Sequence, residues 1–109
     1  PQTTVNRLWL LDPDGAAQFP NEDDITVLVA GFHRARLPEV RADLEGAYMR
    51  RVGALPDGPD LSGAERVSKL VGKIEMPNVM RPAARPGLAF VGDAGLATDP
   101  LVGVGITFA

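Results

Sequence analysis

Apolar runs in the first third of the chain predict an antiparallel sheet. The tetrad Asp12-Pro13-Asp14-Gly15 is flanked by apolar residues, and its proline and glycine favour a β-turn between two strands, Asn6 to Leu11 and Ala16 to Phe19. The β-branched run from Ile25 to Phe32 predicts a third, well-buried strand on the same sheet. A metal-binding loop is the alternative interpretation of the tetrad, but two aspartates supply too few oxygen ligands for it.

The apolar spacing becomes helical after Pro38. Apolar residues recur every three or four positions, which predicts one amphipathic helix from Pro38 to about Val52. A connector rich in glycine and proline follows, and Ser62 as an N-cap predicts a short helix in "SGAERVSKLVG". Three prolines keep "KIEMPNVMRPAARPG" extended, and a short apolar strand, Leu88 to Val91, then leads into Gly92 and Asp93.

Composition narrows the function classes. The 109 residues have the length of one domain, and 45% hydrophobic with 23% charged residues is typical of a folded, water-soluble chain. A net charge of −3 without any basic run argues against a nucleic-acid partner. There is no cysteine and only one histidine, so thiolate chemistry is excluded and no metal site is expected. We expect no membrane span and a cytoplasmic location, because no apolar run approaches the roughly 20 residues that a bilayer requires.

Side chains outside the last quarter of the chain do not indicate a reaction. His33 has no partnered nucleophile, so a surface or loop role is expected, and Trp9 and Tyr48 are expected in or beside the core. The remaining candidates are basic residues that we expect to be solvated surface charges: Arg34, Arg36, Arg41, Arg50 and Arg51.

The closing stretch carries the one pattern that indicates a ligand. Gly92-Asp93 is followed by six residues, Pro100, two residues, Gly103, one residue and Gly105. A carboxylate at the end of a buried strand lies where open α/β sheets bind ligands, and it can accept hydrogen bonds from sugar or ribityl hydroxyls. Glycines let the backbone approach a flat ring, and a helix starting there would point N–H groups at it. A plain sheet-edge turn is the alternative interpretation.

At these residues the sequence resembles a known family. "VGDAGLATDPLVGVGI", with "RPAARPGLAF" before it, is similar to the second flavin-contacting motif of FAD-dependent monooxygenases of the para-hydroxybenzoate hydroxylase fold. That group also contains flavin-dependent halogenases and geranylgeranyl reductases. The resemblance implies that Asp93 binds the ribityl part of FAD and that Gly92 before it also belongs to the cofactor site. It also implies which residues lie against the flavin ring: Pro100, Leu101, Gly103, Val104 and Gly105.

The resemblance also implies a fold and a division of the chain. The complete protein would be α/β, and this chain would be an α+β fragment of it. Residues 1–86 would belong to a β-rich substrate-binding domain with an antiparallel sheet and a helix. Residues 87–109 would begin with a strand of the FAD-binding domain and hold part of its second flavin motif. The first residue, Pro1, is not a methionine, which agrees with an expected fragment.

The implied activity is that of an FAD-dependent oxidoreductase, namely a monooxygenase. In such an enzyme NAD(P)H reduces the flavin, and a flavin C4a-hydroperoxide hydroxylates a small organic substrate. Leu96 stands where aromatic hydroxylases usually have a histidine, so a flavin-dependent reductase or a halogenase-like enzyme remains an alternative. A non-enzymatic domain that binds a small ligand is the other alternative.

The sequence holds only part of a flavin site. The Gly-x-Gly-x-x-Gly loop for the FAD pyrophosphate is missing, and the remainder of the same enzyme would have to supply it. The fragment alone is expected to be inactive, and no side chain is nominated as catalytic.

Overall fold

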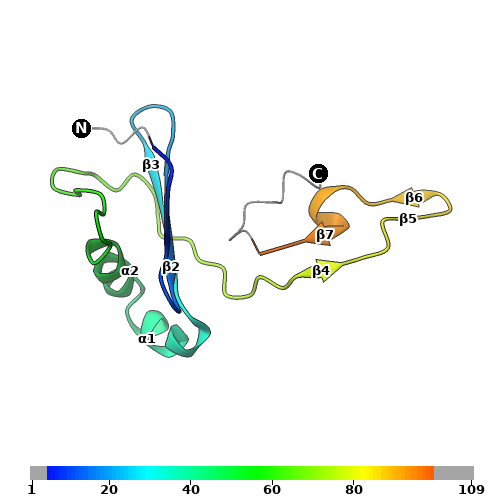
Figure 1. Ribbon diagram of the computed structural model, residues 1–109, viewed down its shortest axis with the longest axis horizontal. Helices are drawn as coiled ribbons and strands as arrows, with labels where there is room; N and C mark the ends of the chain where they lie inside the picture. Colours follow the sequence, from blue (N-terminus) through cyan, green and yellow to red (C-terminus); the bar gives the residue numbers. More distant parts are fainter. Residues whose placement is uncertain (1–4, 100–109) are drawn as a thin grey trace. The chain divides into compact units, whose positions relative to one another are not determined.

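A computed structural model describes residues 5–99 of the chain (Figure 1). The chain divides into two compact units, residues 1–69 and residues 70–109. Helices and antiparallel strands occur together, which confirms the α+β class. The division expected at residues 86 and 87 and the α/β arrangement of a complete protein stay predictions. Within the described range, no helix is long and apolar enough to cross a membrane.

The first unit contains the predicted three-stranded sheet. Its strands are β1 (Arg7–Leu10), β2 (Gly15–Pro20) and β3 (Thr26–Gly31), antiparallel and in the order β1-β2-β3. The loop between β1 and β2 has a cis peptide bond before Pro13, and the N–H of Leu11 donates to the carbonyl of Asp14 across 2.9 Å. The hairpin prediction is thereby confirmed.

The predicted helix is interrupted. A 3₁₀ turn, η1 (Arg34–Arg36), leads into α1 (Leu37–Ala42), and α2 (Leu44–Gly53) follows after Asp43. Asp43 has an extended φ of −150°, and its Oδ1 accepts a hydrogen bond of 2.8 Å from the N–H of Gly46. A Cβ at position 46 would collide with this carboxylate. The prediction of one continuous helix is therefore wrong, because Asp43 caps a new helix.

The core lies between one face of the sheet and α2, and Figure 1 shows both helices on the same side of the strands. Ala16 of β2 packs with Val52 and Leu55. The partly buried side chains around them are Trp9, Leu11, Leu28, Tyr48 and Leu61. The Tyr48 hydroxyl donates to the carbonyl of Leu28 across 3.0 Å, and burial raises the pKa of this tyrosine. The expected core or edge roles of Trp9 and Tyr48 are confirmed.

The other face of the sheet is apolar and exposed. The register sets Leu8 opposite Ala17 and Ala17 opposite Val29, so these residues share the face turned away from α2. Val27 is 41% exposed and Val29 is 46% exposed. The expectation that the third strand is well buried is wrong, because α2 covers only the face that carries Ala16 and Leu28.

Asp14 joins the hairpin to the turn η1 and to α2. Its side chain is only 5% exposed. Its Oδ1 accepts from the backbone N–H of His33 across 2.7 Å, and its Oδ2 accepts from Arg36 Nη1 across 2.7 Å and from Arg51 Nη2. Both guanidinium groups also lie over the ring of Phe32, with Cζ 5.2 and 5.8 Å from its centroid. The expectation that Arg36 and Arg51 are solvated charges is wrong, because both pair with this buried carboxylate.

The connector after α2 has no helix at the predicted place. Asp60 Oδ1 accepts a 2.8 Å hydrogen bond from the N–H of Ser62, and Gly63 has a φ of +78°. Asp60 therefore forms a turn of its own where Ser62 was expected to cap a helix, and that prediction is wrong. "KIEMPNVMRPAARPG" is free of helix, as its prolines predicted.

The second unit is built from short pairs of strands. Strand β4 (Val79–Met80) pairs with β7 (Leu96–Ala97), and β5 (Ala84–Arg85) pairs with β6 (Leu88–Ala89) in a hairpin. A 3₁₀ turn, η2 (Gly92–Ala94), lies between β6 and β7. From 70 to 99 no residue is buried, so this part of the unit has no core of its own.

Replacing Asp14 by asparagine should strongly destabilise the first unit. Asp14→Asn leaves the largely buried guanidinium group of Arg51 beside a neutral amide, whereas Arg36 keeps its ion pair with Glu39. Breaking a buried ion pair typically costs about 3 kcal/mol or more. The midpoint of urea unfolding, followed by circular dichroism, measures the loss. Glu65→Gln, which neutralises an exposed carboxylate in the connector, is the matched control and should leave the midpoint unchanged. An equal effect of the two substitutions would contradict the assigned role of Asp14.

The cap of α2 should make stability depend on acid. The N–H of Gly46, followed by Arg50, holds the pKa of Asp43 below its ordinary value of 3.8. Its contribution is therefore complete above the unfolded pKa and is lost as the pH falls through the folded pKa. The melting temperature of Asp43→Asn should lie below that of the wild type at neutral pH, and the gap should narrow below pH 3.8. A gap that is constant over this range would show that the charge of Asp43 does not contribute, since asparagine also caps helices.

Candidate functional site

Two of the residues predicted to contact a flavin are described by the structure. Gly92 and Asp93 open the turn η2 in the second unit. The other predicted contacts lie outside the described residues: Pro100, Leu101, Gly103, Val104 and Gly105. The candidate site is therefore built here from the segment around Gly92 and Asp93.

The backbone turns sharply at Gly92. Val91 is extended, with φ −124° and ψ 146°, whereas Gly92 has a φ of +58°. The turn closes through a 2.9 Å hydrogen bond from the N–H of Gly95 to the carbonyl of Gly92. Glycine meets the requirement for positive φ without strain, and a Cβ at this position would have no heavy atom within 4 Å. Space beside Gly92 is thus open.

The Asp93 side chain is accessible. The residue is exposed, and no hydrogen bond to its carboxylate is seen within residues 5–99. Its backbone carbonyl, in contrast, faces Arg81 Nη1 at 3.4 Å. An ionised carboxylate offers acceptor positions only, so Asp93 is suited to bind hydroxyl or N–H donors of a ligand.

The strand before the turn differs from the prediction. An apolar, buried strand was expected from Leu88 to Val91, but β6 ends at Ala89 and Val91 is 73% exposed. The hairpin continues only through the N–H of Phe90, which donates to the carbonyl of Ala83 across 2.8 Å. The expectation of a buried strand is wrong for the described chain, because β6 pairs with a single two-residue strand and no layer covers it.

Sequence reasoning missed the two residues that brace this turn. Arg81 donates from its backbone N–H to the carbonyl of Gly95 across 2.8 Å, and from Nη1 to the carbonyl of Ala94 across 3.0 Å. At the far end of the same pair of strands, Asn78 Oδ1 accepts a 2.8 Å hydrogen bond from the N–H of Asp99. The available signal was weak: two polar side chains spaced three residues apart in an extended segment.

His33 serves the backbone. Its Nδ1 accepts a 3.3 Å hydrogen bond from the N–H of Ala35 and so caps the turn η1. Its own N–H donates to Asp14. This agrees with the loop role expected for the single histidine.

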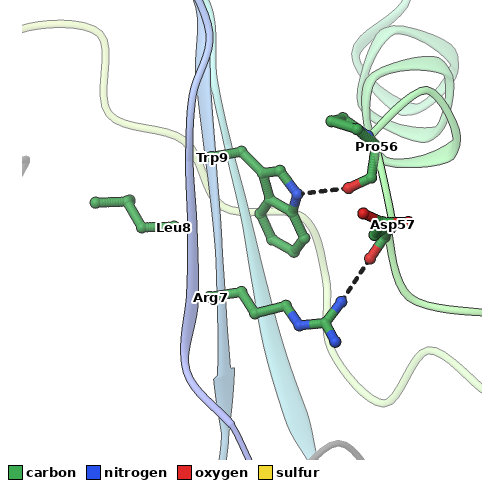
Figure 2. A pocket seen from close by; sticks show the side chains of 5 residues that line it. All are labelled: Arg7, Leu8, Trp9, Pro56 and Asp57. Atoms are coloured by element: carbon green, nitrogen blue, oxygen red, sulfur yellow. Dashed lines mark hydrogen bonds between the residues drawn. The ribbon is translucent and has the colours of Figure 1, made fainter.

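One hollow lies on the first unit, beside β1 (Figure 2). This hollow is open to solvent and has a volume of about 690 Å³. Its lining residues are Arg7, Leu8, Trp9, Pro56 and Asp57. Trp9 Nε1 donates to the carbonyl of Pro56 across 2.8 Å, and Arg7 Nη1 donates to the carbonyl of Asp57 across 2.5 Å. Figure 2 shows both side chains pointing to the Pro56–Asp57 loop. These contacts tie the connector to the sheet, so the polar groups of the hollow serve the fold.

The described part of the chain holds no group of three His, Asp or Glu side chains that is arranged to bind a metal ion. The segment around Gly92 presents an exposed carboxylate beside an open backbone turn.

Comparisons with known proteins identify no relative. No protein-family model, curated protein or solved structure matches the chain.

Gly92→Ala should loosen the turn. A Cβ in the left-handed region costs roughly 1–2 kcal/mol, and this cost is not accompanied by any clash at this position. The amide of Gly95, which is bonded to Gly92, should exchange its hydrogen faster in the variant. Gly72→Ala is the matched control, since Gly72 also has open space around it but no positive φ. Equal exchange of the Gly95 amide in both variants would contradict the turn geometry.

Proposed function

We propose that this chain is part of an FAD-dependent oxidoreductase, a monooxygenase that acts on a small organic substrate. In this proposal Asp93 accepts hydrogen bonds from the ribityl hydroxyls of FAD, and Gly92 lets the cofactor approach the backbone. The proposal rests on the resemblance of "VGDAGLATDPLVGVGI" to the second flavin motif of the para-hydroxybenzoate hydroxylase fold.

The observation that supports it best is the backbone at Gly92. Glycine occupies a position with φ +58°, and the carboxylate of the next residue is exposed and accessible to a ligand. Ribityl hydroxyls are donors and the carboxylate is an acceptor, so the donor set fits this part of the cofactor. A hydrogen bond to a charged group contributes about 1.5–3 kcal/mol, more than a bond between neutral groups.

The chain's own residues would bind and orient the cofactor, and the flavin supplies the redox chemistry when it is bound. NAD(P)H is the proposed source of electrons. Contacts with the flavin ring are proposed for Pro100, Leu101, Gly103, Val104 and Gly105 on the sequence pattern alone.

The lack of buried side chains from residue 70 to 99 agrees with a site that needs further walls. Val91 and Met80 are 73% and 82% exposed. Apolar side chains gain free energy when another surface covers them. In the proposal, the cofactor and the remainder of the same enzyme provide this cover.

The purified full-length protein should be yellow and carry bound FAD. Asp93→Asn should raise the Kd of the apoprotein for FAD about tenfold or more, because the loss of a charged acceptor weakens its hydrogen bonds. Fluorescence titration of the apoprotein with FAD measures this. Asp57→Asn is the control, since Asp57 is exposed, lies in the other unit and adopts a φ of +50° that asparagine tolerates.

Two outcomes would contradict the proposal. A full-length protein without flavin, and without affinity for added FAD, would refute the proposal. The 109-residue chain by itself should bind FAD weakly or not at all, and stoichiometric tight binding would contradict the part-site assignment.

Substrate-dependent oxygen consumption identifies a monooxygenase. Reduction of an alkene without oxygen uptake identifies a reductase, and halide incorporation identifies a halogenase-like enzyme.

A further inference from the structure

We propose that Arg81 is a positioning residue for the candidate flavin site: it holds the turn from Gly92 to Gly95 so that the Asp93 carboxylate faces the ligand. The cofactor assignment in this inference rests on the function proposed above. The mechanical part, that Arg81 fixes the turn, stands on the contacts of the described residues alone.

Arg81 contacts three successive backbone carbonyls of the turn. Its N–H donates to Gly95 at 2.8 Å, and its Nη1 donates to Ala94 at 3.0 Å and reaches the carbonyl of Asp93 at 3.4 Å. The register explains this convergence. Met80, the last residue of β4, pairs with Leu96 of β7, so Arg81 after it lies opposite Gly95.

The turn depends on such outside support because it is too short to sustain itself. A 3₁₀ turn of three residues leaves the carbonyls at its C-terminal end without partners in the turn. The guanidinium group of Arg81 satisfies them with charge-assisted hydrogen bonds, which are stronger than bonds between neutral groups.

The same pairing is fixed at its other end. Asn78 Oδ1 accepts from the N–H of Asp99 at 2.8 Å, so residues 78–81 brace residues 95–99 at both ends. A ladder of two residue pairs specifies its register weakly by itself, and a slip by one residue would turn each side chain to the opposite face. The side chains of Arg81 and Asn78 remove that freedom.

Arg81 fixes Asp93 without neutralising it. The guanidinium group contacts the backbone carbonyl of Asp93, and no contact with its carboxylate is seen among residues 5–99. The acid group thus keeps its acceptor positions for a ligand. An arginine paired directly with the carboxylate would instead compete with ribityl hydroxyls for the same oxygens.

The test uses the full-length protein with Arg81→Gln, Arg81→Lys and a control, Arg85→Gln. Arg85 is an exposed arginine of β5 in the same unit. Hydrogen exchange of residues 92–97 without cofactor reports on the turn, and titration of each apoprotein with FAD reports on the site. Arg81→Gln should speed exchange in the turn only and raise the Kd for FAD about tenfold. Arg81→Lys should recover part of both, because its ammonium group keeps the charge and can donate to one of these carbonyls.

The results separate this inference from the proposed function. If the wild type binds FAD and Asp93→Asn weakens it, but Arg81→Gln changes neither exchange nor the Kd by more than about twofold, Arg81 has no positioning role. A fall in melting temperature that is as large in Arg81→Lys as in Arg81→Gln, without exchange confined to the turn, also overturns it. If the wild type binds no FAD, the proposed function fails, and the exchange data still decide whether Arg81 fixes the turn.

Discussion

The first unit depends on one buried charge. Asp14 is 5% exposed and is held by two guanidinium groups and a backbone N–H, which come from η1, from α2 and from the link after β3. A carboxylate in such a position is tolerated only when its partners are in place, since an unpaired buried charge costs several kcal/mol. The hairpin loop, the end of the sheet and α2 must therefore meet at one point. The turn that joins two strands also fixes where the helices lie.

Local patterns predicted the sheet well and the helices less well. Apolar runs with turn residues between them identified β1, β2 and β3, because each hairpin is decided by neighbours in the sequence. The spacing of apolar residues did not reveal the break at Asp43, because this spacing continues across it. The Asp43 side chain accepts a hydrogen bond from the N–H of Gly46 and so begins a new helix. The helix predicted to begin at Ser62 is absent for a similar reason, because the N–H of Ser62 donates to the side chain of Asp60. Short polar side chains compete with the helix, and spacing alone does not show which one prevails.

For the candidate site, the sequence indicated the turn but not what holds it. Gly92 was singled out as part of the Gly-Asp pair that ends a strand, and its φ of +58° shows a backbone turn at this place. Arg81 and Asn78 act through pairings with residues 12 to 21 positions away, which no local pattern encodes. The expectation of burial from Leu88 to Val91 failed on similar grounds. Apolar character shows that a segment favours cover, but the covering layer is a property of the tertiary structure.

The absence of buried residues from 70 to 99 has a thermodynamic consequence. Any partner that covers Val91, Leu88 and Met80 removes apolar surface from water, so the heat capacity should fall on binding. A ligand bound beside these residues would gain affinity from the apolar surface that it covers as well as from its polar contacts.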